Sequence, residues 1–359
     1  MRLRSELDAL LDRVCRDKPF SGVVLVSDDE GEDVFVRCCG YANRSWKVPN
    51  QRDTRFRIAS VGKTHTAVAV LQLVERGLLS LDTSIIELLG LEDTQISNRV
   101  TILHLLTMTS GIADWIDESP TSRWNWDALK RTTPLYLLGE ATDYLPLFAN
   151  RQPRFPPGES WAYCNANYVL LGMAIEKASG LPYADYMRRN IFLPAGMTDT
   201  DFLSADAAAD RVAEGYVPIL NDDRNLVGWK SNVYDLTIEG GADGGSTSTA
   251  DDLIRFAQLM RQGKIIGPAL LEEMLTPAVE TPFSPQLGYR WWYRYGVEIV
   301  TDVDGRVIRW GHGGEEAGVS CRLHHYPNSG LDVAIMGNAT ECAGPLGIRI
   351  GKIIEDIAN

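Results

Sequence analysis

Residues that favour β-strands gather at the two ends of this 359-residue chain, while patterns typical of helices fill the part between them. Near the start, residues 21–27 and 33–42 are separated by the turn-prone DDEGE, which predicts a β-hairpin. Four further runs of this kind come near the end, split by turn residues: YGVEIVTD, RVIRWGHGG, VSCRLHHYP and LDVAIMGNA. We therefore expect both ends of the chain to contribute strands to one antiparallel sheet.

The middle of the chain carries mainly helix signals and loops. The segments TILHLLTMTSG and NYVLLGMAIEKASG end at Gly111 and Gly180, and glycine there is typical of a helix C-terminus. The predicted fold class is α+β. Residues 1–84 and 241–359 would form an α/β subdomain whose antiparallel sheet is flanked by helices, and residues 85–240 would form a mainly helical insertion.

A helix is also predicted at each end of the chain. The first is amphipathic because charged residues such as Glu6 and Asp8 interrupt its apolar positions, and it lacks the apolar core of a signal peptide. The last begins at Pro345, since proline is favoured in the first turn of a helix. No apolar run reaches the roughly 18 residues of a membrane span, so a cytoplasmic location without a membrane partner is expected.

The chain has 48 acidic and 35 basic residues, a formal net charge of −13, which repels phosphate, so nucleic acid is not expected as a partner. The cysteines show neither a C-x-x-C pair nor the spacing of a disulfide framework, and reduced thiols are expected at all six: Cys15, Cys38, Cys39, Cys164, Cys321 and Cys342. Cys38 and Cys39 are adjacent in a predicted strand, so they point to opposite faces. His324 and His325 do the same, and neither a metal nor another cofactor is expected.

Ser60 and Lys63 stand three residues apart at the start of a predicted helix. This spacing puts both side chains on one face, with Cβ atoms about 5 to 6 Å apart. A buried lysine with a lowered pKa can take the proton of a serine hydroxyl, and a serine N–H at a helix N-terminus can donate to an oxyanion. The alternative is a lysine on a solvated turn beside an N-cap serine, although the apolar flank favours burial of the pair.

Three Y-x-N triplets occur, and two of them, beginning at Tyr41 and Tyr326, are explained as hairpin residues. The remaining triplet, the second in chain order, runs from Tyr163 to Asn165. It follows a Pro-Gly turn and precedes a predicted helix, where a tyrosine can project into a cleft. A phenol near cations can lose its proton below its usual pKa of about 10. Tyr163 is therefore a candidate base or proton relay, and Asn165 can bind a substrate amide.

His312 belongs to the one H-x-G triplet of the sequence, on a predicted strand edge. Gly313 and Gly314 would let a ligand approach the backbone closely. A turn with a hydrogen-bonded histidine explains the segment equally well when it is taken by itself.

In this order, S-x-x-K, Y-x-N and H-x-G resemble the three signature motifs of the class C β-lactamase and penicillin-binding-protein-like family, which includes D,D-peptidases, D-aminopeptidases and carboxylesterases. The phrases LLTMTSG, FPPGESWAYCNANYVLLG and GGSTSTADDLIRF are similar too, so the resemblance extends over about residues 20 to 340. It implies a β-lactamase/transpeptidase-like fold, with the site between the α/β part and the all-helical part.

The resemblance also implies roles for single residues. Ser60 would be the nucleophile of a serine hydrolase, and Lys63 and Tyr163 would move its proton. The implied substrate-binding residues are Asn165, His312, Gly313, Gly314 and Glu315. The backbone N–H of Glu315 would be the second oxyanion donor beside that of Ser60.

Two positions depart from the family pattern. Cys164 replaces a small serine or alanine, which fills space, and His312 replaces the lysine that antibiotic-hydrolysing members place near the substrate carboxylate. A small ester or a peptide or amide is therefore the expected substrate, with β-lactamase or D,D-peptidase activity as the alternative; all proceed through an acyl-serine. Tryptophans near the motifs are candidates to line an apolar pocket: Trp115, Trp124, Trp126, Trp161 and Trp310.

Other classes of protein fit the sequence less well. An α/β-hydrolase needs a G-x-S-x-G turn, and Ile58 stands at its first position around Ser60. The GGADGG run at 240–245 is predicted to be a plain loop, because no G-K-[ST] follows as in a phosphate-binding loop. A ligand-binding or sensor protein with the same fold and without catalysis is the remaining alternative, and the intact Ser60, Lys63 and Tyr163 argue against it.

Overall fold

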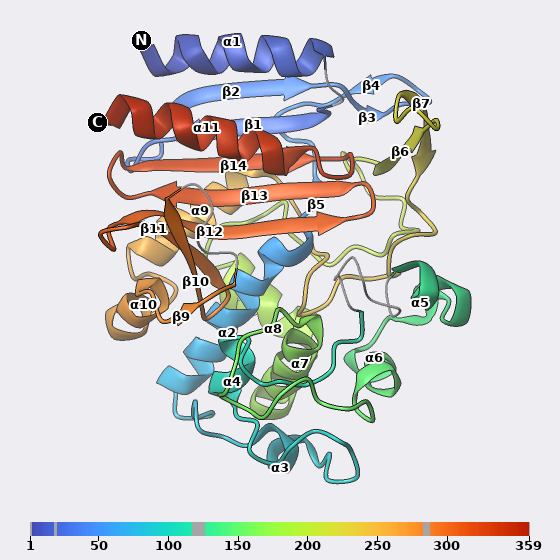
Figure 1. Cartoon of the computed structure of the whole chain (residues 1–359), viewed down its shortest axis with the longest axis vertical. Coiled ribbons are helices and arrows are strands. Elements are labelled where there is room, and N and C mark those ends of the chain that lie inside the picture. Colours follow the sequence, from blue (N-terminus) through green and yellow to red (C-terminus); the bar gives the residue numbers. More distant parts are fainter. Residues whose placement is uncertain (1, 18–19, 117–125, 283–287, 359) are drawn as a thin grey trace.

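The computed structural model describes residues 2–17, 20–116, 126–282 and 288–358. Its centre is an antiparallel sheet in the order β2-β1-β14-β13-β12-β11-β10-β9 (Figure 1). Strand β1 pairs with β14, so the two ends of the chain share this sheet as predicted. The bounds are β1 (Gly22–Ser27), β2 (Asp33–Cys39), β9 (Val279–Glu280), β10 (Tyr289–Arg294), β11 (Val297–Asp302), β12 (Val307–Glu316), β13 (Val319–Tyr326) and β14 (Leu331–Gly337).

Two layers of helices cover the two faces of the sheet. Helices α1 (Arg2–Asp17) and α11 (Ala343–Ala358) lie together on one face, where an apolar cluster that includes Leu7 and Leu346 is buried. Helix α9 (Ala250–Arg261) packs against the other face, and Thr249 caps its N-terminus by accepting the backbone N–H of Asp252 at 3.2 Å. Burial of these apolar faces holds the layers together.

The helical part of the molecule lies on the same side of the sheet as α9. It is built around α2 (Gly62–Glu75) and α7 (Asn165–Ser179), which pack against each other. Both helices are buried along most of their length, which explains why their sequences are apolar on nearly every side. The shorter helices are α3 (Ile85–Leu89), α4 (Ile102–Leu106), α5 (Trp126–Thr132), α6 (Ala141–Phe148), α8 (Tyr183–Met187) and α10 (Pro268–Leu275). Two-residue to six-residue strands form three small pairs: β3 (Tyr41–Asn43) with β4 (Val48–Pro49), β5 (Phe56–Arg57) with β8 (Thr247–Ser248), and β6 (Tyr216–Leu220) with β7 (Leu226–Ser231).

Several predicted boundaries need correction. Helix α4 ends at Leu106 rather than at Gly111, because the chain turns away through Thr107 and the left-handed Met108. Gly111 instead allows the chain to pass close to Phe155, because a Cβ at position 111 would collide with the Phe155 carbonyl oxygen. Helix α11 begins at Ala343, two residues before Pro345. Gly180 does end α7, with φ +70°.

The expectation of six reduced thiols is wrong for one pair. Cys15 of α1 and Cys39 of β2 form a disulfide, with Cα atoms 6.0 Å apart. The sequence gives no sign of it, because 24 residues separate the two and only the packing of α1 on the sheet brings them together. Cys38 points to the opposite face and packs against the larger core cluster, as alternation along a strand requires.

None of the helices within the described ranges is both long and apolar enough to cross a membrane.

Candidate active site

Ser60 lies in a 3₁₀ turn, Ala59–Val61, that leads directly into α2. Its neighbour Ala59 has φ +45°, a strained conformation for a residue with a Cβ, and this sharp turn presents the Ser60 side chain to the site. Lys63 follows in the first turn of α2 and is fully buried, and its Nζ donates to Ser60 Oγ at 2.9 Å. The three-residue spacing therefore brings the hydroxyl and the amine together as predicted.

The amine of Lys63 is held by two more oxygen acceptors. Its Nζ donates to Oδ1 of Asn165 at 2.8 Å and to the backbone carbonyl of Asp243. An ammonium group has three N–H donors, so the three acceptors fix both its position and its orientation beside Ser60. Asp243 belongs to the GGADGG segment, whose role in the site the sequence does not reveal, because it acts through a backbone oxygen that any residue has.

Tyr163 completes the group around Lys63. Lys63 Nζ lies 5.1 Å from the centre of the Tyr163 ring, which is within the range of a cation–π contact. Tyr163 also packs edge-on against Tyr293, at 6.5 Å between ring centres, and its backbone carbonyl accepts a hydrogen bond from Arg154 at 3.1 Å. The second Y-x-N triplet thus lies at the site, while Tyr41 lies in β3 and Tyr326 ends β13.

Asp114 positions the second motif, although no sequence pattern singles it out. Its buried carboxylate accepts the backbone N–H groups of Asn165 and Ala166 at 2.8 and 2.9 Å, which caps the start of α7. The same carboxylate accepts Nδ2 of Asn165 at 3.3 Å. The Asn165 amide is thereby oriented with its oxygen toward Lys63 and its nitrogen toward Asp114.

Strand β12 runs past the Ser60 turn at close range. A Cβ added to Gly314 would lie 3.1 Å from the backbone N of Ser60 and would collide with the carbonyl of Ile58. Only glycine permits this approach, and the next residue, Glu315, lines the same pocket as Ser60. The backbone of Gly313 contacts a different group, the Arg322 side chain, which would lie 3.2 Å from an added Cβ.

His312 is placed differently from the sequence prediction. Strand β12 is an interior strand, between β11 and β13, and the His312 side chain is only 1% exposed. Its Nε2 faces the Tyr293 hydroxyl at 3.4 Å, and its ring lies 6.4 Å from the Tyr163 ring. Burial lowers the pKa of His312; the charge of Glu298 opposes this fall and that of Lys63 adds to it. The imidazole is therefore a neutral partner behind Tyr163.

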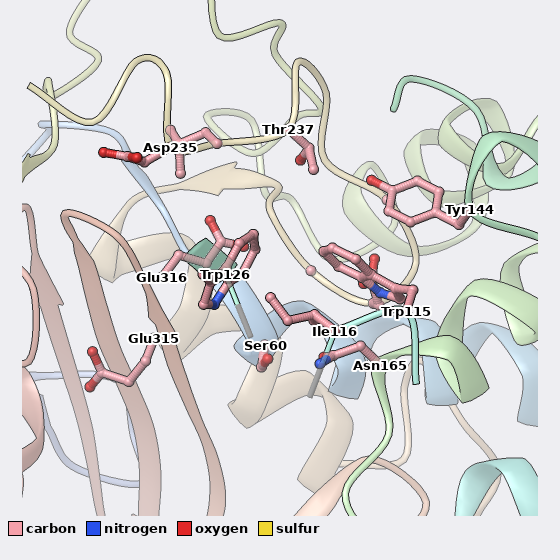
Figure 2. A pocket seen from close by; sticks show the side chains of 14 residues that line it. Ser60, Trp115, Ile116, Trp126, Tyr144, Asn165, Asp235, Thr237, Glu315 and Glu316 are labelled. Atoms are coloured by element: carbon pink, nitrogen blue, oxygen red, sulfur yellow. The ribbon is translucent and has the colours of Figure 1, made fainter. Parts of the chain in front are cut away.

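A pocket opens above Ser60 and Asn165 (Figure 2). Aromatic rings form one wall: Trp115 packs edge to face with Trp126 at 5.6 Å and with Tyr144 at 5.0 Å. The remaining lining residues are Ile116, Asp235, Leu236, Thr237, Gly241, Asp243, Gly244, Glu315 and Glu316.

Only some of the tryptophans predicted to line an apolar pocket do so. Trp115 and Trp126 line the pocket. Trp310 stacks on His325 at 5.1 Å, and Trp161 lies 6.3 Å from the Tyr293 ring. Trp124 lies outside the described residues. Cys164 is buried between α7 and the residues before Asp114, where it fills space.

The model of the β-lactamase family matches residues 7–349 of the chain. The chain belongs to the β-lactamase family. The family resemblance inferred from the three motifs is thereby confirmed, and the chain is a serine hydrolase of this family that works through an acyl-enzyme.

Relatives of this β-lactamase-family hydrolase differ in the activities that their names give. The chain is 29% identical to penicillin-binding protein 4* of Bacillus subtilis, over 94% of this chain and 72% of that protein. It is 31% identical to esterase EstB of Burkholderia gladioli, over 77% of this chain and 74% of that protein. Among solved structures, the penicillin-binding protein of Bacillus halodurans superposes with a TM-score of 0.84 at 32% identity and covers 98% of both chains. The predicted α+β fold with its antiparallel sheet is confirmed.

Proposed function

We propose that this protein hydrolyses a small ester or a peptide or amide bond through an acyl-enzyme on Ser60. The observation that carries the proposal is the contact between Ser60 Oγ and Lys63 Nζ, 2.9 Å, at the base of a pocket. A hydroxyl needs a neighbouring base before it can attack a carbonyl carbon, and the pair Lys63 and Tyr163 supplies candidates for that base.

The proposed reaction has two halves. In the first, Ser60 Oγ bonds to the carbonyl carbon, its proton passes to the Lys63 and Tyr163 pair, and the proton is then given to the leaving alcohol or amine as its bond breaks. The carbonyl oxygen, negative in the tetrahedral intermediate, accepts the N–H groups of Ser60 and Glu315. In the second half, a water molecule gives a proton to the same pair as its oxygen bonds to the acyl carbon, and the bond to Ser60 Oγ then breaks while the pair returns the proton to Oγ, which releases the carboxylic acid.

We propose that substrate binding involves Asn165, His312, Gly313, Gly314 and Glu315, in unequal ways. Asn165 and Glu315 line the pocket, where they can contact a substrate. Gly314 acts by letting β12 approach Ser60, and Gly313 by continuing that strand. His312 is buried behind Tyr163, so it orients the phenol rather than meeting a substrate carboxylate.

A preference for uncharged or amine-bearing acyl groups over lactam antibiotics follows from the same residues. A lysine that could attract the carboxylate of a penicillin is absent at position 312, and the neutral His312 does not replace its charge. The name of the esterase relative supports an ester, and the names of the penicillin-binding proteins keep lactam or D,D-peptide substrates as the second candidate.

Replacement of Ser60 by alanine tests the proposal. The turnover of p-nitrophenyl acetate should fall by at least about 1,000-fold in Ser60→Ala, because acylation loses its nucleophile. Ser329→Ala, in the turn between β13 and β14, is the matched control and should keep wild-type turnover. Wild-type rates in Ser60→Ala would exclude the acyl-enzyme on Ser60, and binding of the ester without any turnover in the wild type would indicate the non-catalytic binding protein instead.

We further propose a cytoplasmic location and no nucleic-acid partner. The second follows from the net charge of −13. The first conflicts with an oxidised Cys15–Cys39 pair, because cytosolic thiols are kept reduced. Rapid alkylation of intact cells followed by mass spectrometry tests the cytoplasmic location. Free thiols at Cys15 and Cys39 would support it, and a disulfide between them would contradict it.

A further inference from the structure

We propose that a second pocket, distinct from the one above Ser60, binds a carboxylate that carries an apolar group. In this proposal Arg99 and Arg154 recognise the anion. The second pocket has a volume of about 400 Å³, and among the described residues the two pockets share no lining residue. The inference therefore goes beyond the proposed hydrolysis and does not depend on it.

Three segments of the helical part form the second pocket. Its lining residues come from residues 97–100, which precede α4, from residues 110–112, which follow α4, and from residues 153–157, which precede the Y-x-N motif of the site. The Gly111 carbonyl accepts the backbone N–H of Arg154 at 2.7 Å, which joins two of these segments. The last segment contains three prolines, whose rings restrict its backbone. The walls are therefore held by the chain itself, and a ligand does not have to order them.

Most of the lining is apolar. Val100 and Ile112 are buried, Phe155 and Pro157 are half-buried, and all four line the second pocket. A volume of about 400 Å³ lies in the range of small-molecule sites, roughly 300–1,000 Å³. A ligand with an apolar group would remove this surface from water, which favours its binding.

Two guanidinium groups border the apolar surface. Arg99 and Arg154 line the second pocket, and the lining residues described include neither aspartate nor glutamate. Within the described part of the chain, no carboxylate forms an ion pair with either arginine. The chain as a whole has a net charge of −13, so a pocket bordered by two cations without a carboxylate partner is complementary to an anion.

Several hydrogen-bond donors are in place for that anion. Arg154 donates Nη1 to the Tyr163 carbonyl at 3.1 Å, which limits the positions of its side chain and leaves further N–H groups of the fork for a ligand. Ser97 Oγ accepts the backbone N–H of Arg99 at 3.3 Å, so the serine hydroxyl can donate its own proton. A carboxylate accepts about four hydrogen bonds and pairs with arginine in a bidentate manner, which matches these donors.

Charge and apolar surface are both needed for the proposed binding. The side chains of Arg99 and Arg154 are exposed, so water and salt screen their attraction for an anion. A small anion such as acetate or inorganic phosphate would gain only this screened attraction and would leave the apolar lining in water. An uncharged apolar molecule would lack the attraction altogether. An apolar carboxylate uses both features of the second pocket.

Isothermal titration calorimetry with three related ligands tests the inference. The wild type should bind 4-phenylbutanoate at least about tenfold more tightly than 4-phenylbutanamide, which lacks the charge, and than acetate, which lacks the apolar group. In Arg99→Gln and in Arg154→Gln, the preference for the carboxylate over the amide should fall to about one- to threefold, because one cation is removed. Arg13→Gln, an exposed arginine on α1, is the matched control and should keep the wild-type preference.

Equal affinities of the wild type for the carboxylate and the amide, or a preference that persists in both pocket variants, would overturn the inference. Tighter binding of inorganic phosphate than of 4-phenylbutanoate would also overturn it, since the apolar lining would then contribute nothing. These titrations need no turnover, so their outcome is independent of the chemistry at Ser60.

Kinetics show which of the two pockets the carboxylate occupies. Because the second pocket is separate, 4-phenylbutanoate at a concentration near its Kd should leave the KM for p-nitrophenyl acetate unchanged. Competitive inhibition with an inhibition constant equal to that Kd would place the carboxylate above Ser60 and would contradict the inference.

Discussion

The orientation of Asn165 depends on one buried carboxylate. Asp114 accepts N–H groups of Asn165 at two points, and it also accepts the backbone N–H of Ala166 and of Trp115. Asp114 holds the Asn165 amide, whose oxygen accepts Lys63 Nζ at 2.8 Å, and we therefore treat it as a positioning residue. Its effect on catalysis should pass through the amide that holds the lysine.

Asp114→Asn should therefore impair both stability and turnover. The new amide would place an NH₂ group against backbone donors, which leaves buried groups without acceptors at a cost of about 1–3 kcal/mol. We expect a lower Tm and a kcat reduced about tenfold or more, with KM less affected, for a substrate that the wild type turns over. Asp304→Asn, in an exposed turn, should change neither. A normal kcat in Asp114→Asn would show that Asn165 needs no such support.

His65 makes the fold sensitive to acid. Its side chain is buried between the edges of Phe192 and Phe256, at 4.3 Å from the latter ring centre, and neither ring nitrogen has a hydrogen-bond partner among the described residues. Burial lowers the pKa of His65 to about 3. The unfolded chain binds the proton near pH 6.5, so the stability linked to this group is complete above 6.5 and is lost as the pH falls toward 3.

The acid sensitivity can be measured by urea unfolding at pH 7.5 and pH 4.5. His65 should cost the wild type about 2–3 kcal/mol between these values. His65→Leu should lose that much less stability over the same interval. If both proteins lose the same free energy, then either His65 is protonated in the folded protein or it is not buried as described.

At the scale of elements, the site depends on the approach of β12 to the turn before α2. Gly314→Ala should separate the two, because the added Cβ would meet the Ile58 carbonyl and the Ser60 N. Even a displacement of about 1 Å can cost a hundredfold in rate, so kcat should fall on that order while the folded state survives. Gly228→Ala in β7 is the control, since its Cβ would lie 3.6 Å from the nearest atom. Equal activity of the two variants would contradict the oxyanion role of this contact.

Elements with local signals were predictable from the sequence. The hairpin of β1 and β2, the four C-terminal strands and helices α1, α2 and α7 lie where period, turn and cap residues indicate them. Strands β9 and β10 extend the sheet beyond those predictions, and β6 and β7 place a hairpin within the stretch predicted to be helical. Their pairing depends on contacts across the fold that a local pattern does not contain.

The same distinction applies to the site. Ser60, Lys63, Tyr163 and Asn165 were predictable because spacing or family order identifies them. Asp114 and Asp243 were not, since one acts through hydrogen bonds to backbone N–H groups 51 and 52 residues away and the other through its own carbonyl. The burial of His312 could not be read from its triplet either, because it depends on the neighbouring strands.

At the scale of the whole molecule, we propose the division into residues 1–84 with 241–359 and a mainly helical insertion, 85–240. Helices α3 to α8 all fall within the insertion. The larger core cluster nevertheless includes Val70, Leu170 and Ile299, so apolar packing runs across the proposed boundary. The site lies along that boundary, with Ser60 from one part and Tyr163 from the other.

The Cys15–Cys39 disulfide should stabilise the molecule without serving the site. A loop of 24 residues closed in the unfolded chain corresponds to about 3 kcal/mol of stability in the entropic model. Cys15→Ser should lower the free energy of unfolding by about that amount and leave kcat unchanged, because the pair lies on the α1 and α11 side of the sheet. The comparison requires urea unfolding and kinetics, without reductant, on the wild type with the bond formed and on Cys15→Ser. An unchanged stability would mean that the bond is absent in solution.

The central claim is that Ser60 is the nucleophile, and covalent labelling tests it most directly. A fluorophosphonate reacts with an activated serine and leaves a stable adduct that peptide mass spectrometry can locate. We expect one modified residue, Ser60, and at least about a hundredfold slower labelling in Lys63→Ala, because the hydroxyl loses the amine 2.9 Å away. Modification of a different serine, or labelling of Ser60 that is equally fast without Lys63, would contradict the account.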